Sequence, residues 1–110
     1  MFKVYNDGSI ELTRGDTAYL LVGITDSEGA SYEMQSGDTL TLSVKKNVTD
    51  EEMSFQKVVK GSSVFHIEPQ DTQALEFGKY KYDVQLETAD GDVYTVLGVN
   101  TFELLKEVTC

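Results

Sequence analysis

The chain has very little cysteine, proline, histidine or tryptophan. Its 110 residues include one cysteine, Cys110, one proline, one histidine, His66, and no tryptophan. A single thiol cannot close an intrachain disulfide, and structural zinc sites made of several cysteine or histidine ligands are excluded. A fold of this chain must therefore be stabilised by an apolar core, and the length is sufficient for one core in a single domain, residues 1–110.

Basic residues are also scarce. The chain carries 9 Lys and Arg against 19 Asp and Glu, which gives a formal net charge of −10. Nucleic acids and anionic membranes would repel such a chain, so we expect neither as a partner. The acids are spread along the sequence and do not form a tail, which is typical of a solvated surface.

Long apolar runs are absent as well. No segment approaches the ~20 apolar residues of a membrane-spanning helix. Residues 1–8 lack the apolar stretch that a secretion signal requires. We therefore expect a protein that is made in the cytoplasm without a secretion signal.

Strict alternation of apolar and polar residues is the strongest positive signal. Over residues 78–87, Tyr80, Tyr82, Val84 and Leu86 share one face, and polar or charged side chains occupy the other. Such a period of two predicts a strand with one buried side. The Asp-Gly pair at 90–91 then predicts a hairpin turn.

Similar short strands, separated by turn residues every 8–12 positions, predict an all-β sandwich or barrel. The expected strands cover residues 10–12, 17–25, 38–45, 55–59, 64–67, 93–97 and 101–105. Residues 69–75, which begin with Pro69, predict one helical turn. The expected core consists of the inward positions Leu20, Val22, Leu40, Leu42, Val44, Phe65, Ile67, Tyr80, Tyr82, Val84, Leu86 and Phe102.

Two strand placements follow from the pattern. Residues 17–25 are apolar on both faces, because Tyr19 and Leu21 alternate with the inward residues, and we therefore expect a central strand. Residues 55–59 and 64–67 flank a Lys-Gly-Ser-Ser turn and are expected to form a hairpin.

A helical turn followed by Gly78, Tyr80 and a strand is typical of the corner between strands E and F of immunoglobulin-like sandwiches. There a tyrosine hydroxyl bonds back to the preceding backbone, and Tyr80 is the candidate for this structural corner. Its hydroxyl is expected to contribute more to stability than that of Tyr82, which takes the place of the second cysteine of an antibody domain. We predict an immunoglobulin-like antiparallel β-sandwich with one short helical turn.

No arrangement of residues typical of a catalytic or metal site is found. His66 is a lone histidine on a predicted strand, and acid–base catalysis needs a second positioned group. Acidic loops around Asp26, Asp50 and Asp90 lack the spacing of an EF-hand, and no phosphate-binding glycine loop occurs. We predict no catalytic residue, no metal and no cofactor.

Two short motifs have simple explanations. The Arg-Gly-Asp sequence at 14–16 matches a tripeptide that integrins bind, but so short a motif is common by chance, and a turn between strands is the better explanation. The sequence Asn-Val-Thr at 47–49 fits a glycosylation acceptor, which requires export. We interpret the first as a turn and give the second no role.

The strand after the hairpin is the candidate interface. A two-residue turn at Asp90-Gly91 places Val93, Thr95 and Leu97 on the core side, and a three-residue turn with a bulge places Tyr94 and Val96 there. In both cases an uncharged strand near a sheet edge exposes apolar side chains, which a free monomer normally avoids. The predicted interface residues are Val93, Tyr94, Thr95, Val96 and Leu97.

Three segments carry a family resemblance: residues 12–17 (LTRGDT), 37–44 (GDTLTLSV) and 75–86 (LEFGKYKYDVQL). Together they resemble small phage and prophage tail proteins, in particular the N-terminal domain of siphophage baseplate upper proteins. That domain is an immunoglobulin-like module that docks receptor-binding machinery onto the tail. The likeness covers residues 10–108, and because no fibre or coiled coil follows, it implies a separate small virion or tail-assembly subunit.

The resemblance implies a non-enzymatic structural or assembly module of a phage or prophage tail or baseplate, a virion component made in the bacterial cytoplasm. Its partners would be other tail or baseplate proteins, or further copies of itself. The alternative is a free-standing immunoglobulin-like adhesion or ligand-binding domain, for which an export signal or anchor is expected. A small hydrolase is a remote third because the necessary side chains are missing.

Overall fold

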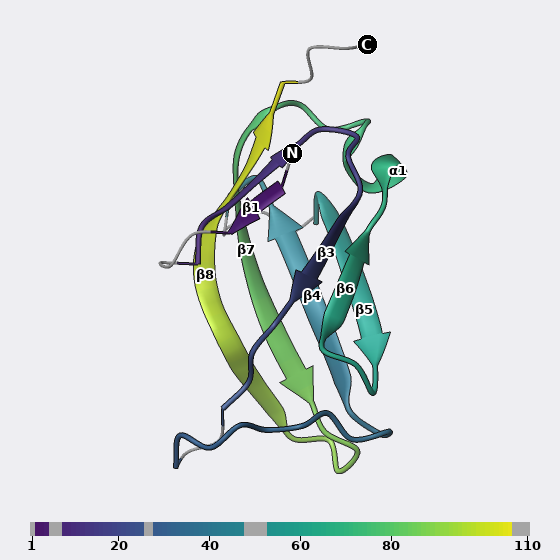
Figure 1. The fold of residues 1–110 in the computed structure, drawn as a ribbon, viewed down its shortest axis with the longest axis vertical. Coiled ribbons are helices and arrows are strands. Elements are labelled where there is room, and N and C mark those ends of the chain that lie inside the picture. The colour runs from purple at the N-terminus through teal and green to yellow at the C-terminus, as the bar shows by residue number, and fades with distance from the viewer. Residues whose placement is uncertain (1, 5–7, 26–27, 48–52, 107–110) are drawn as a thin grey trace.

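The computed structural model describes residues 2–4, 8–25, 28–47 and 53–106. These residues are almost entirely strand and turn, with one short helix (Figure 1). In chain order the elements are β1 (Phe2–Val4), β2 (Ile10–Thr13), β3 (Ala18–Leu21), β4 (Thr39–Lys45), β5 (Phe55–Lys60), β6 (Val64–Ile67), α1 (Pro69–Thr72), β7 (Gly78–Glu87) and β8 (Val93–Leu105).

The strands form two layers. A six-stranded sheet has the order β1-β2-β8-β7-β4-β5, and β3 and β6 pair in a second sheet that lies across it (Figure 1). All pairs are antiparallel except β2 and β8, which run parallel. The all-β sandwich predicted from the sequence is therefore confirmed, with the correction that its larger sheet is mixed.

The order of strands agrees with an immunoglobulin-like arrangement. In such domains strands C, F and G lie in one sheet, a further strand joins the C edge in the variable type, and strands B and E belong to the other sheet. Here β4, β7 and β8 occupy the places of C, F and G, β5 is the added strand, and β3 and β6 take the places of B and E.

Three details of the predicted strands were wrong. The strand around Tyr19 is not central, because it belongs to the two-stranded sheet. Strands β5 and β6 do not form a hairpin, since β5 pairs with β4 and β6 pairs with β3. The segments 93–97 and 101–105 are one long strand, β8, and not two.

The core lies between the two sheets and contains every residue that the alternation predicts. Each of these side chains is buried, and Leu40, Leu42 and Val84 are completely so. The sequence reading omitted a smaller set of buried side chains, which come mostly from the short strands: Ile10, Leu12, Ala18, Ile24 and Leu104. Because burying one such side chain stabilises the fold by about 1.5–3 kcal/mol, the central strands hold the two layers together.

Two tyrosine hydroxyls connect β7 to distant backbone. The Tyr80 hydroxyl donates a hydrogen bond of 2.6 Å to the carbonyl of Glu76, the backward bond expected at the corner. The Tyr82 hydroxyl donates to the carbonyl of Gly8 and so attaches the chain before β2 to the sheet. The sequence does not predict this second bond. Because both hydroxyls are hydrogen-bonded, there is no longer a reason to expect the Tyr82 hydroxyl to contribute less to stability than the Tyr80 hydroxyl.

Candidate functional site

The turn between β7 and β8 decides which side chains the predicted interface exposes. The backbone amide of Thr88 donates to the carbonyl of Asp92 at 2.8 Å, and the amide of Gly91 donates to the carbonyl of Thr88 at 2.9 Å. Gly91 has a φ of 90°, a conformation that glycine adopts without strain. Together these features define a three-residue loop closed by a bulge, the second of the two alternatives left open by the sequence.

The side of the sheet to which each side chain of β8 points depends on this register and on later irregularities in the pairing. Tyr94 lies opposite the buried Leu86 and so belongs to the core side of the sheet, while Val93 and Thr95 belong to the outer side. A shift of register then falls at Val96, after which Leu97 lies opposite the buried Val84, and a second shift falls between Leu97 and Asn100, which lies opposite Tyr82. The core side therefore receives Tyr94 and Leu97, a combination that neither simple alternation predicts.

One edge of this part of β8 has no neighbour in the described part of the chain. β2 pairs only with Phe102–Leu105, at the far end of β8. We call the remaining stretch, Val93–Val99, the β8 edge. Its exposed apolar side chains are Val93, Tyr94 and Val99, with 58%, 54% and 59% of their surface accessible.

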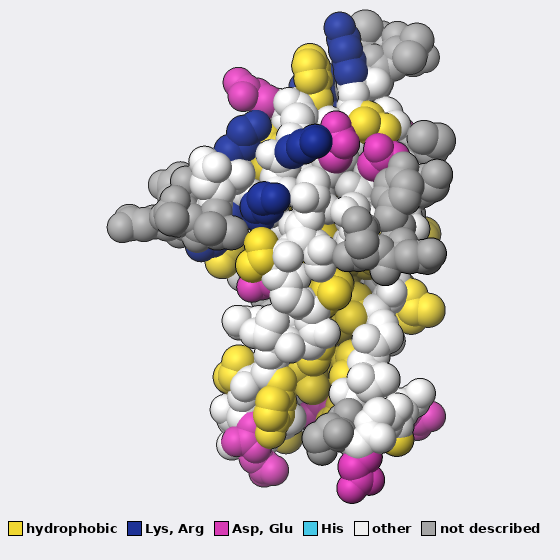
Figure 2. Space-filling model, turned by 90° about the vertical axis from the view of Figure 1, so that its left-hand side faces the viewer, with side chains coloured by type: hydrophobic (Ala, Val, Ile, Leu, Met, Phe, Trp, Pro, Cys, Tyr) yellow, Lys and Arg dark blue, Asp and Glu magenta, His cyan; other side chains and the backbone are white. Residues whose placement is uncertain are grey.

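The β8 edge borders the core. Val96 and Leu97 are half-buried and pack against the core cluster, as Tyr32 and Met34 do from the loop before β4. Figure 2 looks onto the side on which β8 lies and shows a line of hydrophobic side chains down the lower half of the molecule. An exposed apolar surface is thus continuous with the interior at this edge.

Charge is unevenly distributed along the same side. Lys79 and Lys81 lie beside the upper part of β8, opposite Glu103 and Thr101. Asp90 and Asp92 are exposed in the hairpin at the other end. In Figure 2, the Lys and Arg side chains lie in the upper half, where some acids also lie, and the charged side chains seen at the lower end are acidic.

A pair of hydrogen-bonded side chains holds the loop beside this hairpin. Asp38 is buried, and its carboxylate accepts bonds from the Tyr32 hydroxyl and, at 3.0 Å, from the Gln35 amide. The bond from Tyr32 is the main cause that lowers the pKa of Asp38, and the same bond raises the pKa of Tyr32. The loop that approaches Tyr94 is therefore fixed by a charged hydrogen bond.

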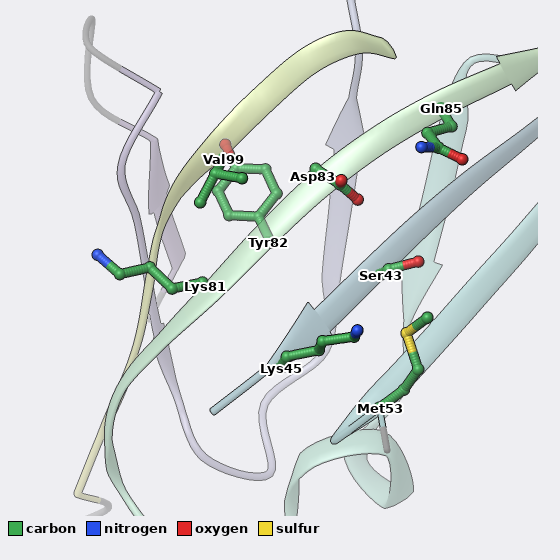
Figure 3. A pocket seen from close by; sticks show the side chains of 8 residues that line it. All are labelled: Ser43, Lys45, Met53, Lys81, Tyr82, Asp83, Gln85 and Val99. Carbon is green, nitrogen blue, oxygen red and sulfur yellow. The ribbon is translucent and has the colours of Figure 1, made fainter. Parts of the chain in front are cut away.

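The outer face of the larger sheet contains a shallow hollow of about 290 Å³ (Figure 3). It is lined by Ser43, Lys45, Met53, Lys81, Tyr82, Asp83, Gln85 and Val99. The Ser43 hydroxyl accepts a bond from the Gln56 side-chain amide at 3.0 Å, and no histidine is among the lining residues. These residues therefore do not include the serine–histidine pair of a serine hydrolase.

The Arg-Gly-Asp segment forms a turn whose arginine is engaged. The Arg14 guanidinium donates to the carbonyl of Leu75 at 3.0 Å and lies 5.2 Å from the centre of the Phe77 ring. Gly15 has a φ of 85°, and its amide donates to the Thr72 hydroxyl at 2.9 Å. The turn interpretation accounts for all of these contacts.

His66 is exposed on β6, and its ring stacks on that of Tyr19 with the centroids 4.5 Å apart. Both residues belong to the outer face of the two-stranded sheet, which also exposes Leu21 and Val64. Tyr19 and Leu21 are 64% and 71% accessible. The sequence reading missed this surface because it interpreted a strand apolar on both sides as central.

The remaining motifs of the sequence can be compared with the structure only where it describes the chain. Within the ranges that the structure describes, no group of three or more His, Cys, Asp or Glu side chains could hold a metal ion. Over the same ranges, no helix is long and apolar enough to cross a membrane. The threonine of the glycosylation motif, residue 49, and the acids at residues 26 and 50–52 lie outside the described residues.

Comparisons with protein-family models, with curated proteins and with solved structures find no match for this chain. The class of protein that fold and surface define is an immunoglobulin-like β-sandwich with an unpaired, apolar strand edge in its described part.

Proposed function

We propose that the chain is a non-enzymatic assembly module that docks through the β8 edge. The observation that carries this proposal is the uncharged stretch Val93–Val99, which lacks a strand neighbour in the described residues and exposes three large apolar side chains. Natural proteins normally protect free edges with charge. The opposite edge of the same sheet follows that rule, since β5 carries Lys57 and Lys60.

The setting that we propose is a phage or prophage tail or baseplate, with the protein as a virion component made in the bacterial cytoplasm. The support is the resemblance of residues 12–17, 37–44 and 75–86 to small tail proteins. In the fold these residues form the turn after β2, the central strand β4 and the tyrosine corner with β7. Partners would be other tail or baseplate proteins or further copies of the chain.

Lysine substitution of the outward pair tests the docking role. Val93→Lys combined with Thr95→Lys adds two charges to the outer side of the β8 edge, where both side chains are exposed. Docking then requires the two lysine ammonium groups to lose their water, so we expect incorporation into tail particles to be lost. Because both positions are exposed, we expect the midpoint of thermal unfolding to change little. Incorporation is measured by quantitative mass spectrometry of purified tails.

The matched control places the same charges on the other edge. Gln56→Lys combined with Val58→Lys alters exposed side chains of β5 and leaves β8 untouched. This variant is expected to enter tail particles normally. Normal incorporation of the β8 variant, with a fold as stable as that of the parent, contradicts the proposal.

A free-standing adhesion or ligand-binding domain is the second candidate. It is favoured by the apolar side chains on the outer face of β3 and β6, where Tyr19, Leu21 and Val64 are exposed. The two functions are distinguished by the neighbouring genes, because a tail subunit lies among tail genes. An adhesin gene would instead encode an export signal or an anchor.

A further inference from the structure

We propose that the occupant of the β8 edge is a basic segment of another protein, in which apolar side chains are flanked by lysine or arginine. This inference rests on the proposed docking function and adds the chemistry of the partner. It depends on two features of the same surface. Along the β8 edge, Val93, Tyr94 and Val99 are each more than half exposed. Around these apolar side chains lie five acidic residues of β7, the hairpin and a neighbouring loop: Asp83, Glu87, Asp90, Asp92 and Glu33.

Two of the acids lie on β7, next to the outer side of the β8 edge. Glu87 is exposed and lies directly opposite Val93 in the pairing of β7 with β8. Asp83 lines the hollow on the outer face of the larger sheet, as Val99 does (Figure 3). Each end of the exposed apolar stretch therefore has a carboxylate beside it on the neighbouring strand.

The other three acids lie at the lower end of the same side. Asp90 and Asp92 are exposed in the hairpin that leads into β8, and Glu33 is exposed in the loop before β4. This loop contacts the hairpin, because a Cβ atom built on Gly37 would lie only 2.7 Å from the Cβ atom of Ala89. Figure 2 shows the line of hydrophobic side chains on this side and acidic side chains at its lower end.

None of the five carboxylates forms an ion pair within the described part of the chain. Two lysines of the same sheet are engaged elsewhere. Lys57 pairs with Glu68 and Asp71 beside α1, and Lys81, which also lines the hollow, donates to the Thr101 hydroxyl at 3.3 Å, toward the upper end of β8. Unpaired carboxylates attract a cationic partner, since complementary potentials steer two proteins together and disfavour partners of like charge.

The same charges argue against the other occupants of an apolar edge. A second copy would add the same acids to the interface, and each chain carries a net charge of −10. Nucleic acids and anionic membranes are acidic as well and would be repelled. Over the residues that the structure describes, no group of acids could hold a metal ion that would bridge to such a partner. A protein segment with apolar side chains at its centre and cationic ones at its ends complements both features of the surface.

Binding of two synthetic peptides tests the chemistry of the partner. The first peptide has alternating valine and threonine with two lysines at each end, and the second has glutamate in place of each lysine. Titration of the isotope-labelled chain, followed by NMR, should show that the lysine peptide shifts the backbone amides of residues 87–99. The glutamate peptide should bind at least about tenfold more weakly. The affinity for the lysine peptide should decrease several-fold between about 0.05 M and about 0.5 M salt.

Neutral substitutions locate the effect on the chain. Glu87→Gln combined with Asp92→Asn removes two of the acids, and the dissociation constant of the lysine peptide should rise roughly threefold to tenfold. The matched control is Glu76→Gln combined with Glu103→Gln, which changes the net charge equally but away from the β8 edge. This control should bind the lysine peptide as the parent does. Circular dichroism melts establish that each variant is folded.

Equal affinity for both peptides, no binding of either, or an equal loss of affinity in the two pairs of substitutions overturns the inference. A dimer of the chain alone that is dissociated by Val93→Lys combined with Thr95→Lys overturns it as well, because the occupant is then a second copy. If the inference fails while the Val93→Lys, Thr95→Lys variant still does not enter tail particles, the proposed function stands and only the chemistry of the partner differs.

Discussion

Removing the hydroxyl of Tyr80 is expected to destabilise the domain by about 1 kcal/mol. The hydroxyl donates at 2.6 Å to the Glu76 carbonyl, and a net contribution of about 0.5–1.5 kcal/mol is usual for such a bond. Tyr80→Phe keeps the buried ring and its contact with the Lys46 ammonium, 4.7 Å from the centroid. The loss therefore reports the corner bond and not a cavity.

Urea denaturation measures this loss. With an m-value of roughly 1–3 kcal/mol/M, a loss of 1 kcal/mol lowers the midpoint by roughly 0.3–1 M, with the slope unchanged. Tyr19→Phe is the control, because Tyr19 is exposed and no hydrogen bond of its hydroxyl is seen among the described residues. Tyr82→Phe should lose a similar amount through its bond to Gly8.

Alkaline pH provides a second readout of the same residue. Burial is the main cause that raises the pKa of Tyr80 above 10.0, its ordinary value. Between the pKa of the unfolded chain and that of the folded one, the unfolded state releases the proton first, so stability decreases as pH rises. Tyr80→Phe should therefore show a shallower decrease above pH 10. A Tyr80→Phe variant as stable as the parent at neutral pH, with the same alkaline decrease, refutes this account of the corner.

Other perturbations address the core, the loops and the turn. Leu42→Ala, at a fully buried position of β4, should cost about 2–5 kcal/mol in urea denaturation. The pKa of Asp38 is lowered in the fold, so its stabilising contribution is present above the ordinary value of 3.8 and is lost as pH falls through the lowered pKa. In Asp38→Asn, the free energy of unfolding should therefore decrease less steeply with falling pH over that range. Excess calcium, compared with chelator at matched ionic strength, should leave the melting temperature unchanged. Gly91→Ala, at a φ of 90°, should cost about 1 kcal/mol.

The central part of the fold is predictable from sequence because its strands alternate regularly. Residues 78–87 and 39–45 each bury one face, and the period of two identifies that face without knowledge of the neighbours. The parallel pairing of β2 with β8 is not predictable in this way. It depends on which strand lies beside β2 in the tertiary structure. The four-residue sequence of β2 does not indicate that neighbour.

The candidate site was found in the sequence as a segment but not as a surface. The lack of charge from Val93 to Val99 marks it as unusual for an exposed strand. Which side chains point outward depends on the loop before it and on two register shifts, one at Val96 and one between Leu97 and Asn100. Such a bulge arises from pairing with β7, and the local sequence does not specify it.

For the face formed by β3 and β6, the sequence predicts burial, and the structure shows exposure. Tyr19 and Leu21 alternate with buried residues, and a strand apolar on both sides is usually covered on both. In the described residues the second sheet has only two strands, and its outer side is uncovered. Composition alone cannot distinguish a central strand from one that exposes an apolar face to a partner.

Hydrogen exchange along β8 tests docking through this strand most directly. Backbone amides of residues 93–98 are compared between the dilute chain and the chain at the concentration, or in the particle, where it assembles. The account predicts strong additional protection of these amides on assembly and none at the β5 edge, residues 55–60. Equal exchange of the β8 amides in the free and the assembled protein would contradict the account.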